Sequence, residues 1–277
     1  MSDSILAIPL DGSRAEILLN ANSSESYPTV SANNASRLLL VQVHRVDSEG
    51  KVANHLRLFE PQTLQWHDFP DAPGPVGSGI LAPDESAALF EVGGGSPGVM
   101  RSSLWLLHLR SNQTKQITEL VDWQRDMSPR WAPSGESIAF LRLRRTPKGL
   151  ISRLFVANLD TRLLSQPVGT DVSVSAVCYS SDGRRLFLLT ATGVEAFSFA
   201  NGSRSIIARW SEFQGREYHG GGISWSKGLG AVALVLWNKN ERRTEIWTLP
   251  LNDQAPSIFF KTQPDQDLRS LTIAEAD

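Results

Sequence analysis

A short polar turn followed by an apolar run recurs along the chain. The clearest copy is 130–140, which reads RWAPSGESIAF. Matching segments are anchored at residues 31, 81, 131, 179 and 225, which lie 50, 50, 48 and 46 residues apart. The turns are rich in Pro, Asp, Asn, Ser and Gly, which reverse the chain for known backbone reasons. Five copies within so narrow a range of spacings indicate an internal repeat.

Each repeat has the same plan of short β-prone segments. The turn leads into a second strand, such as 138–143, and a variable polar loop leads to a third strand, such as 154–157. Another polar turn precedes a fourth strand, such as 115–118 or 257–260. The segments are short, and no long helical period competes with them. The pattern predicts four antiparallel strands per unit, as in a propeller blade.

The two ends of the chain extend the pattern. Residues 5–11 (ILAIPLD) align with 246–252 (IWTLPLN), which predicts a third strand, with 14–19 as its fourth. Residues 268–274 resemble a first strand. The sequence therefore predicts an all-β fold, a six-bladed β-propeller of four-stranded antiparallel blades. Its last blade is composite and built from both termini, a closure that hides edge strands.

The composite blade has no predicted second strand. It has three strands, or the chain is truncated or completed by a partner, or a segment assigned here to a loop supplies the strand. We expect one propeller domain over 1–277, with the composite blade at 1–20 plus 265–277. The other predicted blades cover about 28–70, 76–120, 127–170, 174–210 and 220–262.

Two of the repeats carry a family resemblance. The segments at 128–140 (SPRWAPSGESIAF) and 179–186 (YSSDGRRL) resemble the TolB-type propeller repeat, a Trp-Ser-Pro-Asp-Gly-like turn followed by an apolar strand. The resemblance covers nearly the whole chain through its five units and is degenerate at 31 and 225. It implies the propeller fold and a bias toward protein or peptide contacts. TolB is periplasmic, and the hydrolase domain that accompanies prolyl-oligopeptidase propellers has no room in this chain.

Composition narrows the function classes. The 27 basic and 29 acidic residues give a net charge of -2, which offers no general case for nucleic-acid binding. No apolar run reaches the length of a membrane span, and the lone Cys178 cannot form an internal disulfide. The acidic start lacks the features of a signal peptide. We expect a monomer without cofactor, cytoplasmic if the chain is complete and periplasmic if a signal peptide was removed.

The glycine-rich segment 93–98 (GGGSPG) fits both a nucleophile elbow around Ser96 and a dinucleotide fingerprint. Both motifs need a strand that leads into a helix. The following residues instead lead into a strand, and Pro97 removes the N–H that an oxyanion hole would use. The segment is therefore interpreted as a hairpin loop.

Two segments before first strands hold the candidate binding residues. They are 122–127 (DWQRDM) and 217–222 (EYHGGG), and we assign both to loops near the propeller axis. A tryptophan close to an arginine is typical of interaction hot spots. The alternatives are a tryptophan packed under a blade edge and a glycine-rich connector with an exposed histidine. The predicted ligand- or partner-binding residues are Asp122, Trp123, Arg125, Asp126, Glu217 and His219.

Five histidines show no metal-binding spacing, so no metal site is predicted. A basic run at Arg142, Arg144, Arg145 and Lys148 is either a docking patch for an acidic partner or a solvated strand end.

Clear repeats beside weak catalytic motifs favour a non-enzymatic scaffold that binds a protein or peptide through loops at one face. The alternative is a propeller enzyme, a hydrolase or lyase, with its site at the central channel mouth. In a third possibility, the chain is one domain of a longer protein whose other part carries the chemistry.

Overall fold

The computed structural model describes most of the chain. The described residues are 4–9, 16–20, 25–32, 38–46, 52–69, 74–94, 101–119, 121–147, 149–169, 172–252, 254–268 and 271. They form β-strands and a single short 3-10 helix, Trp210–Glu212. No helix among these residues is long and apolar enough to cross a membrane.

The strands form five antiparallel units of four and one pair. The pair is β1 (Ser4–Ala7) and β2 (Glu16–Asn20). The first unit is β3 (Glu25–Ala32), β4 (Leu39–Val46), β5 (Val52–Glu60) and β6 (Gln65–Asp68). The second is β7 (Val76–Leu81), β8 (Ala87–Gly93), β9 (Arg101–His108) and β10 (Gln113–Gln116).

The remaining units follow the same order. The third is β11 (Gln124–Trp131), β12 (Ser137–Thr146), β13 (Gly149–Asn158) and β14 (Leu164–Ser165). The fourth is β15 (Val174–Tyr179), β16 (Arg185–Thr190), β17 (Gly193–Ser198) and β18 (Arg204–Arg209). The fifth is β19 (Arg216–Ser226), β20 (Ala231–Asn238), β21 (Arg243–Pro250) and β22 (Ser257–Lys261).

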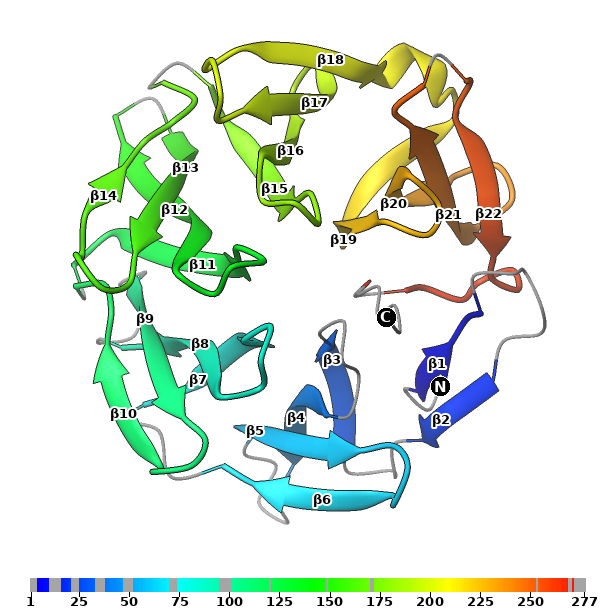
Figure 1. Cartoon of the computed structure of the whole chain (residues 1–277). Helices are drawn as coiled ribbons and strands as arrows, with labels where there is room; N and C mark the ends of the chain where they lie inside the picture. Colours follow the sequence, from blue (N-terminus) through cyan, green and yellow to red (C-terminus); the bar gives the residue numbers. More distant parts are fainter. Residues whose placement is uncertain are drawn as a thin grey trace.

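The units follow one another around a common centre (Figure 1). Each presents its first strand to the inside, as β3, β11, β15 and β19 do, and its fourth strand to the outside. The second and third units are also joined by a short parallel pairing of β9 with β11, at Gln124 opposite Arg101 and Arg125 opposite Ser102. The first strands therefore line the inside of this arrangement.

The recurring turn has a local chemical cause. In the fourth unit the Asp182 carboxylate accepts hydrogen bonds from the Ser180 hydroxyl at 2.6 Å and from the Arg184 N–H at 3.0 Å. These bonds, that of Ser180 first, hold the pKa of Asp182 below its usual value. Gly183 has a φ of +68°, a conformation that glycine adopts without a steric cost. The turn is thus set by residues adjacent in sequence.

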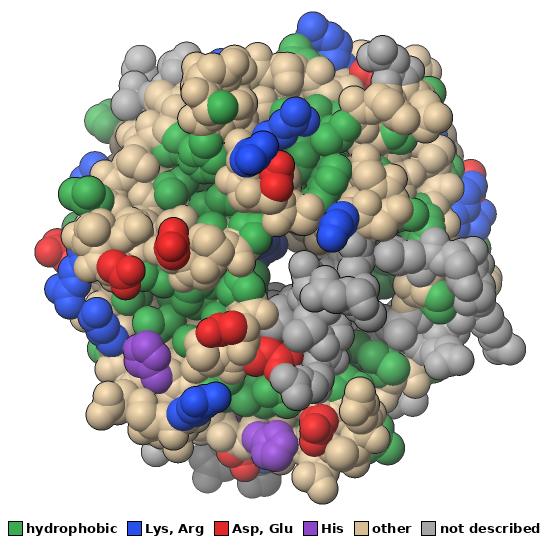
Figure 2. All heavy atoms as spheres, viewed as in Figure 1, with side chains coloured by type: hydrophobic (Ala, Val, Ile, Leu, Met, Phe, Trp, Pro, Cys, Tyr) green, Lys and Arg blue, Asp and Glu red, His purple; other side chains and the backbone are tan. Residues whose placement is uncertain are grey.

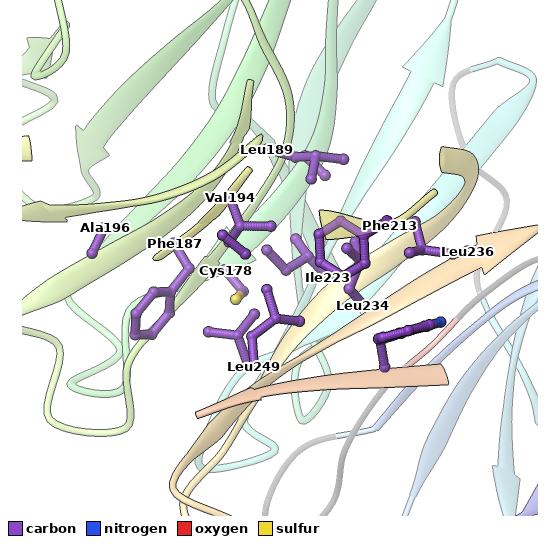
Figure 3. Packing of buried hydrophobic residues seen from close by; sticks show 14 residues of the cluster. Cys178, Phe187, Leu189, Val194, Ala196, Phe213, Ile223, Leu234, Leu236 and Leu249 are labelled. Carbon is purple, nitrogen blue, oxygen red and sulfur yellow. The ribbon is translucent and has the colours of Figure 1, made fainter. Parts of the chain in front are cut away.

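The second strand of each unit contains a run of consecutive buried residues, and apolar clusters on its two faces join neighbouring units. On β12, Ile138 and Phe140 pack against the second unit, whereas Ala139 and Leu141 pack against the fourth. Figure 3 shows the equivalent cluster between the fourth and fifth units, with Phe187 on one side and Leu234 on the other. Fully burying a side chain of this size contributes about 1.5–3 kcal/mol. The second strands therefore carry runs of consecutive apolar residues, such as 138–141 in β12 and 231–236 in β20.

The all-β antiparallel prediction is confirmed, and the strands expected at 138–143, 154–157 and 257–260 are present. The fourth strand expected at 115–118 lies at Gln113–Gln116. The assignment of 122–127 and 217–222 to loops is wrong. Most of the first segment belongs to β11, and all of the second belongs to β19, because backbone pairing with β12 and β20 extends past the polar residues.

The interpretation of the glycine-rich segment as a hairpin agrees with the structure. The N–H of Gly94 donates to the Arg101 carbonyl at 3.3 Å, and β8 pairs directly with β9. The next described residues after Gly94 form β9, whereas either motif would require a helix. Ser96, Pro97 and Gly98 lie outside the described residues.

Candidate functional site

The first strands share an irregularity near their starts. The register shifts between Met127 and Arg130 in β11, between Tyr218 and Ile223 in β19, and between Val76 and Gly79 in β7. Such bulges re-aim side chains and backbone donors. In β11 the shifted stretch includes Ser128, whose φ is +53°. Its backbone N–H is thereby free to bond outside the sheet.

That N–H donates to a buried carboxylate of the neighbouring unit. Glu91, on β8, accepts from the Ser128 N–H at 2.8 Å and from the Ser78 hydroxyl at 2.6 Å. The guanidinium of Arg125 lies 3.7 Å from its other oxygen. Gly77 makes room for this group, because a Cβ there would lie 2.9 Å from Oε2 of Glu91. The carboxylate therefore joins the second and third units.

The pKa of Glu91 is raised because burial disfavours its charged form, and this effect outweighs the hydrogen bonds from Ser78 and Ser128 and the charge of Arg125. A raised pKa on an inner carboxyl group is typical of functional sites and also of structural ion-pair networks. The contacts of Glu91 are those of a network between units.

Arg130 lies further along β11. Burial lowers the pKa of its guanidinium, and the electrostatic influences of Cys178, Tyr218 and Glu91 oppose that shift. These three groups come from β15, β19 and β8, so the side chain lies on the inner side of β11. Burial raises the pKa of Cys178 to about 12, which leaves it a thiol at neutral pH. Tyr218 also has a raised pKa, again chiefly through burial.

Four of the six predicted binding residues lie at the start of β11 or just before it, each with a partner. Asp122 accepts from Arg101 at 3.0 Å and is exposed. Asp126 is fully buried and binds Arg142 through both carboxylate oxygens, at 2.7 and 2.8 Å. The guanidinium of Arg125 pairs with the Glu91 carboxylate. Trp123 is exposed, and its indole contacts the guanidinium of Arg145. The acids of this segment therefore hold arginines in place.

The other two predicted residues lie on β19. Glu217 forms an ion pair of 2.7 Å with Lys239, within its own sheet. The side chain of His219 lies outside the described part of the structure. The β11 residues instead contact groups on β8, β9 and β12. The two predicted groups thus have separate sets of partners.

The residues of the predicted basic patch also differ in their contacts. Arg142 is held by Asp126, Arg145 stacks on Trp123 at 4.8 Å, and Arg144 is exposed at the end of β12. Lys148 lies outside the described residues. On the face drawn in Figure 2, which is hollowed at its centre, charged side chains are scattered and form no single patch.

The sequence did not single out Glu91, Ser78, Ser128 or Arg130. A signal was present, because Glu91 is an ionisable residue inside an otherwise apolar run, 87–92. Charged residues are seldom fully buried without a partner. No group of three or more His, Cys, Asp or Glu residues within the described ranges could hold a metal ion.

Comparison with known proteins places the fold. Neither a family model nor a curated protein matches the sequence. TolB from Acinetobacter baumannii superimposes with a TM-score of 0.64 at 13% identity, over 89% of this chain and 56% of that one. Putative TolB from Agrobacterium tumefaciens superimposes with a TM-score of 0.72 at 12% identity, over 98% of this chain and 93% of that one. Oligogalacturonate lyase from Vibrio parahaemolyticus superimposes with a TM-score of 0.59 at 13% identity, over 92% of this chain and 70% of that one.

The chain thus spans little more than half the length of the Acinetobacter protein. At these identities the likeness concerns the arrangement of strands and leaves the chemistry of the site open. The TolB likeness agrees with the repeat turns at 131 and 179. The chain has the TolB-type propeller fold.

Proposed function

We propose that this chain is a non-catalytic module that binds a protein or peptide through a surface formed by Trp123, Arg125 and Arg145, the Trp123 surface. The backbone of Trp123 has a φ of +62°, and its carbonyl accepts a hydrogen bond from the Arg145 N–H at 3.1 Å. A non-glycine residue held in this region costs on the order of 1–3 kcal/mol. The residue is nevertheless 41% exposed. This strained backbone beneath an exposed indole is the observation that carries the proposal.

The neighbours of Trp123 support a binding role. The guanidinium of Arg145 lies 4.8 Å from the indole centroid, a cation–π contact that restricts both side chains. Tryptophan and arginine are the residues most enriched at binding hot spots. Side chains ordered before binding lose less entropy when a partner arrives. Trp123 and Arg145 should therefore lose little side-chain entropy when a partner binds.

The acids among the predicted binding residues favour binding over acid–base chemistry. Asp122, Asp126 and Glu217 are held by Arg101, Arg142 and Lys239 respectively. A general acid or base must reach a substrate proton. Carboxylates that form ion pairs with basic side chains of the same chain are better suited to orienting those side chains than to transferring a proton.

We also propose that the ring has six blades and is closed by both termini. Ile8 from the start of the chain and Leu268 and Leu271 from its end pack into one cluster with β20 and β21. A Cβ on Gly222 of β19 would lie 3.8 Å from the Leu271 carbonyl oxygen. In Figure 1 this C-terminal segment runs between β19 and β1, where the first strand of a sixth blade would lie.

A capture experiment tests the binding role. Wild-type protein, Trp123→Ala and Leu251→Ala are immobilised in parallel and exposed to lysate of the source cells, and any retained protein is purified for titration. Leu251 is a matched control, since it is 38% exposed and lies outside the Trp123 surface. Loss of a hot-spot tryptophan is expected to weaken binding by at least about 2 kcal/mol, roughly thirtyfold. Equal retention by all three proteins would overturn the proposal.

A second candidate is a hydrolase or lyase at the central channel mouth. Arg130 favours it, because its side chain interacts with Glu91 and Tyr218 on other units. This candidate predicts turnover of a small substrate by the purified chain. Activity lost in Arg130→Ala and kept in Trp123→Ala would favour the enzyme over the scaffold.

A further inference from the structure

A cavity of about 410 Å³ lies between the second and third units. Its walls come from the end of β10 and the following residues, the start of β11, the end of β12 and the β13–β14 turn. Ile117, Leu159 and Leu164 supply apolar walls. Small-molecule sites typically have volumes of about 300–1,000 Å³. None of the three residues of the Trp123 surface lines the cavity, so a ligand here is independent of the proposed function.

One wall carries an arginine fixed in place. Nε and Nη2 of Arg142 bind Asp126, and the guanidinium lies 4.6 Å from the ring centroid of Phe155. The remaining nitrogen, Nη1, makes no hydrogen bond to any described residue. A buried carboxylate that orients an arginine leaves the free donor in a defined position. Such a donor suits a planar anion such as a carboxylate.

A second polar group at the cavity has no hydrogen-bond partner. Gln124 is only 5% exposed, and its backbone N–H donates to the Val121 carbonyl. Its side-chain amide makes no hydrogen bond within the described ranges, although the residue lines the cavity. Neither amide atom is fully enclosed, so both can bond a ligand or water that enters the cavity. The amide can donate through its nitrogen or accept through its oxygen.

The charge of the lining favours an anion. Arg144 and Arg162 line the cavity, are exposed, and form no ion pair with any described residue. Glu119 is the one acidic residue among the described residues of the lining. Since Arg142 is neutralised by Asp126, the unpaired charges are two positive and one negative. A monoanion would bring the lining and its ligand to neutrality.

We propose that this cavity binds a small organic monocarboxylate with a compact apolar body. Nη1 of Arg142 and the Gln124 amide bind the carboxylate group, Arg144 and Arg162 attract it, and Ile117, Leu159 and Leu164 cover the apolar part. The site is distinct from the central channel, because it lies between two adjacent units and reaches their outermost strands at Gln116 of β10 and Leu164 of β14.

The test uses hexanoate as the probe on the full chain, with 1-hexanol and hexylamine as matched probes without the anion. Binding is followed by the side-chain amide signals of Gln124 in a ¹⁵N–¹H spectrum. Hexanoate should shift these signals in a saturable manner, whereas neither control should. The affinity will be weak, since a ligand so small offers few contacts. Equal shifts with hexanol, or no shift with hexanoate, would overturn the proposal.

Variants locate the probe. Gln124→Leu keeps the shape of the side chain and removes the amide, and it should weaken hexanoate binding about tenfold, as measured by ligand-observed saturation transfer. Arg144→Ala and Arg162→Ala should each weaken it by a few fold. Gln113→Leu and Lys115→Ala, on β10 but outside the lining, are the matched controls and should leave it unchanged. Equal affinities for Gln124→Leu and Gln113→Leu would place hexanoate elsewhere and refute the assignment.

Discussion

The carboxylate of Asp126 and the guanidinium of Arg142 face each other across β11 and β12, joined by hydrogen bonds of 2.7 and 2.8 Å. Asp126 has no solvent exposure. The Arg142 guanidinium also contacts the rings of Phe140 and Phe155. The pair fixes the geometry of the innermost two strands of the third unit. It also orients the arginine that lines the cavity between units.

Asp126→Ala is expected to lower the free energy of unfolding by about 3–5 kcal/mol, because it leaves Arg142 with a largely buried charge and no partner. Asp68→Ala is the control. It breaks the ion pair with Arg57, in which the aspartate side chain is 80% exposed, and should cost less than about 1 kcal/mol. Urea unfolding of both variants measures the difference. Similar small losses would show that the Asp126 pair contributes no more than a surface pair.

Glu91→Gln should change how stability depends on pH. Burial raises the pKa of Glu91 in the fold above its usual value of 4.5, so the folded protein holds this proton more tightly than the unfolded chain does. The contribution of Glu91 to stability is therefore full below pH 4.5 and falls as the pH rises toward the folded pKa. Glutamine has no such dependence.

Urea unfolding of wild type and Glu91→Gln from about pH 4 to about pH 8 measures this effect. The stability of the wild type relative to the variant should decrease with rising pH and then level off. A difference that stays constant across the range would contradict the raised pKa.

The turns and the strands they join could be predicted from sequence because their chemistry is local. The Ser180 hydroxyl and the Asp182 carboxylate that close a turn are two residues apart. The buried faces of β12 could also be anticipated, since every residue of 138–141 is apolar. Repetition of these local rules was enough to indicate an all-β fold of similar units.

The candidate site depends on contacts that no local pattern records. Glu91 and Ser128 are 37 residues apart, and their bond requires both the stacking of two units and the bulge in β11. The same holds for Arg130, whose neighbours come from three other units. The start of β11 was assigned to a loop because its residues are polar, yet Asp126 is buried by pairing with Arg142. A polar residue in a strand is predictable only when its partner is known.

Cys178 should be unreactive in the folded protein. The thiol is buried and its pKa is raised to about 12, so almost no thiolate is present at neutral or mildly alkaline pH. Iodoacetamide at mildly alkaline pH should leave the native chain unmodified and modify it fully in urea, as measured by intact mass. Rapid labelling of the native protein would contradict the packing of Cys178 between the fourth and fifth units.

Trp123→Gly separates binding from stability. Glycine adopts a positive φ without the steric cost that tryptophan pays, and the lost indole is partly exposed, so the midpoint of thermal unfolding should not fall. Binding of the captured partner should nevertheless be lost. Leu64→Gly is a matched control, since Leu64 has a φ of +56°, is 68% exposed and lies in the first unit. It should relieve similar strain and leave binding intact. A marked loss of stability in Trp123→Gly alone would instead identify the tryptophan as a structural residue, and the exposed indole would then owe its conformation to packing against Arg145.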